Sequence, residues 1–109
     1  MTDGFDDRKK GTLAKWAHDE ELRFKVMARR NKLLGLWAAG EMGIAAPRSE
    51  AYAKEVIQAD FEEAGDEDVF RKIRKDFDAR KVAMSDHLIR RKMEELLAIA
   101  GDQVMAEKK

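Results

Sequence analysis

The chain has 109 residues, of which 44% are hydrophobic and 40% charged, a composition that suits one small domain with its apolar side chains gathered on stripes. Its 22 Lys and Arg balance 22 Asp and Glu, and the zero net charge argues against binding to nucleic acid or lipid headgroups by overall charge. The absence of cysteine excludes a disulfide scaffold, a cysteine-ligated metal and a thiol nucleophile.

Targeting segments are not evident either. The sequence has no run of roughly 18 apolar residues, the length that spans a membrane. Residues 1–10 contain three acids and lack the apolar stretch of a signal peptide. We therefore expect a cytoplasmic protein without direct membrane insertion.

The N-terminal third of the chain predicts an arm followed by a long helix. Residues 1–12 fit no apolar stripe, and we expect them to be a flexible arm that is disordered in the free protein. One long helix, or two coaxial helices, is predicted from Leu13 to about Ala39, with Thr12 as N-cap and a bend between Arg29 and Gly35. Its apolar residues at helical spacing are Leu13, Ala17, Phe24, Met27, Ala28, Leu33, Leu34, Trp37 and Ala38.

Three further amphipathic helices are predicted. The first begins at Ser49 and ends at Gly65, with Tyr52, Ala53, Val56, Ile57, Phe61 and Ala64 on its apolar stripe. The next begins at Asp66 or Asp68, ends between Asp78 and Met84, and directs Val69, Phe70, Ile73 and Phe77 inward. The last runs from Ser85 or Asp86 to Gly101 and carries Leu88, Ile89, Met93, Leu96, Leu97 and Ala100.

No segment has the pattern of a strand, and the fold class predicted is therefore all-α. Short connections between one-sided helices favour a small four-helix bundle. We expect a single helical domain over residues 13–101 and a polar tail over residues 102–109.

Two clusters of charge are candidate sites. The run from His18 to Glu21 lacks the second histidine of a zinc helix and is typical of a solvated helix start, while His87 is typical of a surface histidine. An acidic cluster follows later in the chain and comprises Asp60, Glu62, Glu63, Asp66, Glu67 and Asp68. It indicates a solvated corner or a surface for a basic partner.

A basic stretch on the first helix has two interpretations. It comprises Arg23, Lys25, Arg29, Arg30 and Lys32. Arg29, Arg30 and Lys32 are candidates for contact with the phosphates of ATP or ADP, although no glycine-rich phosphate loop accompanies them. The alternative is pairing with the acidic cluster. No other cofactor is indicated, and the lack of a nucleophile with an oriented base argues against an enzyme.

Several strings resemble those of one family. They are FDDR (residues 5–8), AKWAHDEE (14–21), ARRNKLLGLWAA (28–39), YAKEV (52–56) and ADFEEAGDEDV (59–69). In this order they are similar to the inhibitor subunit zeta of alphaproteobacterial ATP synthase over about residues 5–77. At Lys9, Lys10, Gly11 and Thr12 the chain departs from the acidic and apolar run usual in that family.

The resemblance implies a regulatory protein bound to the F1 sector and peripheral to the inner membrane. Residues 1–21 would be the inhibitory segment, entering the catalytic interface between the alpha and beta subunits beside the gamma subunit and blocking rotation in the hydrolysis direction. The implied contacts are Phe5, Asp6, Asp7, Arg8, Lys15, Trp16, His18, Asp19, Glu20 and Glu21. The remaining alternative is a nucleotide-responsive or adaptor protein without inhibitory activity.

Overall fold

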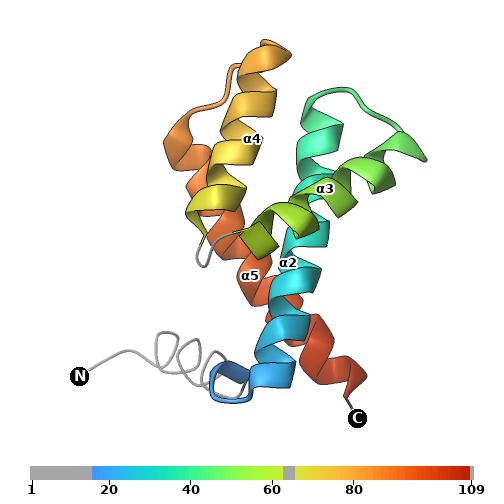
Figure 1. The fold of residues 1–109 in the computed structure, drawn as a ribbon, viewed down its shortest axis with the longest axis vertical. Coiled ribbons are helices and arrows are strands. Elements are labelled where there is room, and N and C mark those ends of the chain that lie inside the picture. Colours follow the sequence, from blue (N-terminus) through green and yellow to red (C-terminus); the bar gives the residue numbers. More distant parts are fainter. Residues whose placement is uncertain (1–15, 63–65, 109) are drawn as a thin grey trace.

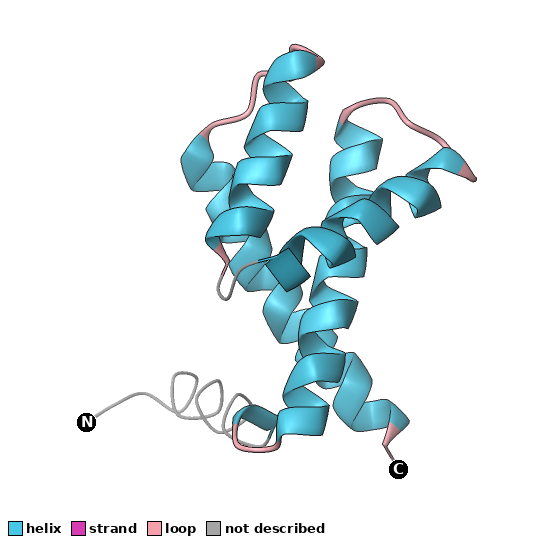
Figure 2. Ribbon diagram, viewed as in Figure 1, coloured by secondary structure: helices cyan, strands magenta, loops and turns pink. Residues whose placement is uncertain are grey.

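The computed structural model describes residues 16–62 and 66–108, which form four α-helices and no strand (Figure 1, Figure 2). The helices are α2 (Glu20–Glu41), α3 (Arg48–Glu62), α4 (Glu67–Ala79) and α5 (Asp86–Glu107). The predicted all-α fold with four helices is confirmed. The predicted arm, residues 1–12, lies outside the described residues.

The start of α2 differs from the prediction of one helix from Leu13. Trp16 and Ala17 are helical, but the chain turns at His18 and is extended at Asp19. The side chain of Asp19 accepts a hydrogen bond from the backbone N of Leu22 at 3.1 Å, which makes it an N-cap. A capping carboxylate followed by two glutamates favours a new helix start, and this local effect outweighs the apolar spacing across the break.

The other helix starts lie close to those predicted. α3 begins at Arg48, one residue before Ser49, and α4 follows Asp66. α5 follows Ser85, whose Oγ accepts a hydrogen bond from the backbone N of Leu88 at 3.1 Å. α2 also continues through Gly35 without interruption.

The prediction that α5 ends at Gly101 with a polar tail was wrong. α5 continues to Glu107, and Val104 is buried within this extension. Gly101 serves the packing of Trp16, described below, and does not terminate the helix.

The helices enclose two apolar clusters. α2 packs against both α3 and α5, and α4 packs against α3 and α5 (Figure 1). The upper core comprises Leu34, Ala38, Ala39, Tyr52, Val56, Val69, Phe70, Ile73, Phe77, Ile89 and Met93. The lower core comprises Trp16, Leu22, Val26, Ala100 and Val104.

The predicted apolar stripes agree only in part with the residues that are buried. All four inward residues of α4 are buried, whereas on α2 the buried pair is Leu22 and Val26 in place of the predicted Phe24 and Met27. Phe24 is 58% exposed. The predicted stripe of α5 also included Leu88, which is exposed.

Polar contacts fix α4 to its neighbours. The hydroxyl of Tyr52 donates to Oδ2 of Asp76 at 2.7 Å, and burial together with this bond raises the pKa of Tyr52. At the other side of α4, Arg74 donates to the carbonyl of Met84 at 2.6 Å and to Asp86 at 2.9 Å. These bonds hold the α4–α5 connection against α4.

Gly35 allows α2 and α3 to approach closely. A Cβ atom at this position would lie 2.6 Å from Cα of Ala53 and 3.1 Å from its Cβ. The small pair therefore sets the distance between the two helices, and the lower helix propensity of glycine is compensated by packing.

Replacing Gly35 with alanine is expected to lower the free energy of unfolding by about 2 kcal/mol, because the added methyl group forces the two backbones apart. Gly40→Ala is the matched control, since nothing lies within 4 Å of a Cβ at that position. Urea unfolding of both variants measures the difference. Equal stability of the two variants would contradict the close contact.

Candidate functional site

The N-terminal end of the described chain lies against α5. Trp16 is 5% exposed and belongs to the lower core with Ala100 and Val104. A Cβ at Gly101 would lie 2.7 Å from Nε1 of Trp16, so the indole rests on α5 where that helix carries no side chain. We call this contact surface, formed by Ala100, Gly101 and Val104, the tryptophan seat.

The seat leaves one polar group unsatisfied. Nε1 of Trp16 is buried and has no hydrogen-bond partner among the residues that the structure describes. A buried donor without an acceptor costs about 1–3 kcal/mol. Among the described residues, only apolar contacts hold the indole, and they must outweigh this polar cost.

The structure describes only part of the remaining predicted inhibitory segment. Phe5, Asp6, Asp7, Arg8 and Lys15 lie outside the described residues. The group His18, Asp19, Glu20 and Glu21 is exposed at the start of α2. Their carboxylates cap and flank a helix N-terminus, as the prediction of a solvated helix start states.

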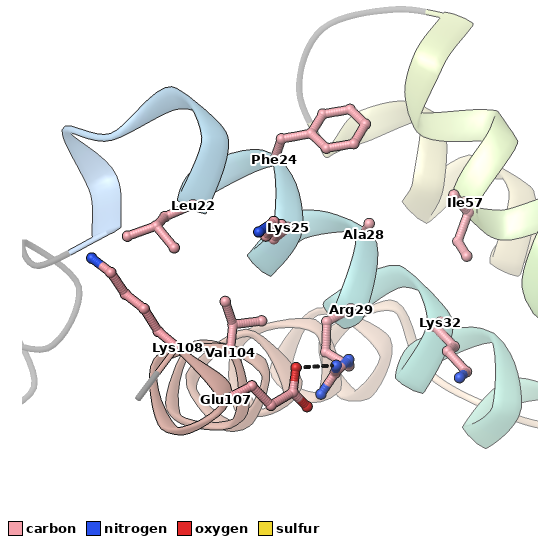
Figure 3. Close-up of a pocket in the computed structure, with 10 residues that line it drawn as sticks. All are labelled: Leu22, Phe24, Lys25, Ala28, Arg29, Lys32, Ile57, Val104, Glu107 and Lys108. Carbon is pink, nitrogen blue, oxygen red and sulfur yellow. Dashed lines mark hydrogen bonds and ion pairs between the residues drawn. The ribbon is translucent and has the colours of Figure 1, made fainter.

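A groove runs beside this end of the molecule, between the first half of α2, α3 and the end of α5 (Figure 3). Its volume is about 540 Å³. The lining combines apolar side chains, four cationic side chains and the carboxylate of Glu107, namely Leu22, Phe24, Lys25, Ala28, Arg29, Lys32, Ile57, Val104, Glu107 and Lys108. Such a lining suits a mixed apolar and anionic contact.

Arg29 closes one side of the groove by joining α2 to α5. Its guanidinium donates to Oε1 of Glu107 at 2.8 Å (Figure 3). It also donates to Oε1 of Gln103 at 2.8 Å. Both acceptors lie in the extension of α5 beyond Gly101. Because the predicted helix ended at Gly101, this contact was not predicted from the sequence.

Arg30 is the most buried charged residue that the structure describes. It is 1% exposed, as is Asn31. Its Nε donates to Oδ1 of Asn31 at 2.7 Å, and its NH2 donates to Oδ1 of Asp66 at 2.8 Å. This polar layer lies on α2 between Val26 of the lower core and Leu34 of the upper core.

Asp60 completes the polar layer from α3. Burial raises the pKa of its carboxyl, and a hydrogen bond with Asn31 and the charge of Arg30 act in the opposite direction. Asn31 therefore bonds on one side to Arg30 and on the other to Asp60. The layer joins α2, the end of α3 and the start of α4.

The candidate phosphate contacts are thus divided. Arg29 and Lys32 line the groove, whereas Arg30 is directed into the protein toward Asp66. The spacing of four residues from Val26 and from Leu34 was the sequence signal that placed Arg30 on the buried face. Its charge made an external role look more natural.

Three members of the acidic cluster form ion pairs within the chain. Asp66 binds Arg30, Asp68 binds Arg71, and Glu67 lies 2.9 Å from Arg90. The hydrogen bond from Arg90 lowers the pKa of Glu67. Pairing of the basic stretch with the acidic cluster, one of the two alternatives, is confirmed for Arg30 and Asp66.

The described residues offer neither a metal site nor a membrane-spanning helix. Residues 16–62 and 66–108 contain no group of three or more His, Asp or Glu side chains placed to hold a metal ion. In the same residues, no helix is long and apolar enough to cross a membrane.

These features define a small all-helical protein with a short docked segment preceding its bundle. The sequence model of the family described as ATPase inhibitor subunit zeta matches residues 1–103, and the chain belongs to this family. A solution NMR structure of a protein 48% identical to this chain has a TM-score of 0.71 and covers 79% of this chain and 98% of its own. No curated protein matches the chain. Family membership supports an inhibitory regulatory role.

Replacing Asp66 with asparagine is expected to lower the free energy of unfolding by about 2 kcal/mol, because buried Arg30 loses its anionic partner. Capping does not explain such a loss, since the Asp66 side chain makes no capping hydrogen bond. Glu107→Gln is the control. It removes the charge from a more exposed pair and should cost at most about 0.5 kcal/mol. Equal losses in chemical unfolding would refute the distinction.

Proposed function

We propose that this protein binds the F1 sector of ATP synthase and inhibits ATP hydrolysis. The observation that carries the proposal is the family match over residues 1–103, which includes the whole N-terminal segment. The protein would act from the cytoplasm, peripheral to the inner membrane through F1.

The proposed mechanism divides the chain into an inserting part and an anchoring part. Residues 1–21 enter the catalytic interface between the alpha and beta subunits beside the gamma subunit. There they obstruct rotation in the hydrolysis direction while permitting rotation in the synthesis direction. The helices α2–α5 remain folded and bind the outside of F1.

The geometry supports this division at the start of α2. The chain is extended at Asp19, and α2 has its own cap there. The segment before the break can therefore change position without removing the cap of α2. His18, Glu20 and Glu21 are exposed on this end and are available for contact with F1.

The roles of individual residues follow from their chemistry. Phe5 and Trp16 would supply apolar contacts in the interface, where large aromatic side chains contribute most to binding. Asp6, Asp7, Arg8, Lys15 and the acidic run ending at Glu21 would meet charged groups of the F1 subunits.

A role in binding ATP or ADP has less support. Arg30 is occupied by Asp66 inside the protein, and Arg29 is occupied by Glu107 and Gln103. Lys32 would then be the remaining member of the proposed phosphate contact. Titration with ATP, followed by amide chemical shifts of Arg29 and Lys32, distinguishes this alternative.

The test is inhibition of ATP hydrolysis by F1 with the full chain and with a variant lacking residues 2–15. This deletion retains Trp16 and the Asp19 cap, so the lower core and α2 keep their contacts. We expect the truncated protein to require at least about tenfold more protein for half-inhibition, because the binding energy of the inserting segment is lost.

Thermal unfolding of the truncated protein is the control and should match that of the full chain. Equal inhibition by the two proteins would refute insertion of the N-terminal segment. Loss of inhibition together with loss of folding would call for shorter deletions, each compared at equal stability.

A further inference from the structure

We infer that Trp16 is a reversible latch: its indole is docked on the tryptophan seat of α5 in the free protein and leaves the seat when F1 is engaged. The inference rests on the proposed function and adds a regulatory step to it. It is carried by the burial of Trp16, the close contact with Gly101 and the unsatisfied Nε1.

Docking and insertion are mutually exclusive for this side chain. Trp16 is 5% exposed in the docked arrangement, which leaves almost none of its surface for a partner. An inserting segment that includes Trp16 must therefore withdraw the indole from the seat. The fraction of molecules with a released indole then scales the apparent affinity for F1.

The seat is suited to reversible contact. Ala100 and Gly101 present little side-chain surface to the indole, and its N–H has no acceptor among the described residues. Release returns this donor to water or to an acceptor on F1, which offsets part of the lost apolar contact.

Release need not unfold the bundle. Only Ala17 and His18 separate Trp16 from Asp19, whose carboxylate caps α2 independently of the seat. Arg29 continues to join α2 to α5 through Gln103 and Glu107. The break at Asp19 thus provides a hinge between the latch and the first stable helix.

Gly101→Ala tests the latch, because the added methyl group would lie 2.7 Å from Nε1 and displace the ring. Alanine has a higher helix propensity than glycine, so α5 itself is favoured. Gly40→Ala is the matched control, with nothing within 4 Å of the new Cβ. The sequence contains two tryptophans. Each variant is therefore made in the full chain on a Trp37→Phe background, in which Trp16 is the only tryptophan.

Two quantities are measured for each protein: the emission wavelength and acrylamide quenching of Trp16 in the free protein, and the concentration for half-inhibition of F1. We expect Gly101→Ala to shift the emission to longer wavelength, increase quenching, and lower the half-inhibitory concentration by at least about threefold. Gly40→Ala should leave both quantities unchanged. Val104→Ala, which removes part of the seat without adding bulk, should change both in the same direction as Gly101→Ala.

The outcomes separate the latch from the proposed function. An exposed Trp16 in Gly101→Ala with unchanged inhibition overturns the latch while the inhibitory function stands. The latch is also overturned if Trp16 is equally exposed in Gly101→Ala and in the Gly40→Ala control. If neither the control nor Gly101→Ala inhibits F1, the proposed function fails and the regulatory role of the latch fails with it, even where fluorescence shows the indole docked.

Discussion

The buried guanidinium of Arg30 is the constraint on which the arrangement of the helices depends. An unpaired charge inside a protein costs several kcal/mol, so α2 can bury Arg30 only where acceptors are supplied. Asn31 supplies one from the same helix, and Asp66 supplies another from the start of α4. Through Asn31, the layer also reaches Asp60 near the end of α3. The end of α3 and the start of α4 are therefore tied to one point on α2, which fixes where the chain passes from α3 to α4.

This polar layer lies between two apolar clusters of unequal size. The upper core draws on all four helices and contains eleven buried residues. The lower core has five, contributed by Trp16, α2 and the end of α5. Trp16, the first described residue, thus packs in the smaller cluster. Its movement can occur without disturbing the packing of α3 and α4, which is the property that an anchored, inserting segment requires.

The sequence predicted the helical class and the internal face of α4 because apolar spacing there is regular and uninterrupted. It failed where two physical effects competed. Asp19 interrupts an apolar pattern with a strong capping signal, and Gly101 has the appearance of a helix end although its small size serves the indole of Trp16. On α2, the buried face runs from Val26 through Arg30 to Leu34, and the charge of Arg30 prevented its recognition as part of that face. The proposal that residues 1–21 insert rests on family resemblance, whereas the docking of Trp16 depends on a contact between distant segments that spacing does not reveal.

Site-specific photocrosslinking tests the central claim most directly, because the chain contains no cysteine and a single introduced thiol can be labelled alone. A crosslinker attached to Phe5→Cys reports on the inserting segment, and one attached to His87→Cys reports on the exposed start of α5. Under ATP hydrolysis, the account predicts that the label at position 5 reacts with the gamma subunit, beside which the inserting segment is proposed to lie, and that the label at position 87 does not. Crosslinks to the gamma subunit from position 87, or none from position 5 while hydrolysis is inhibited, would contradict it.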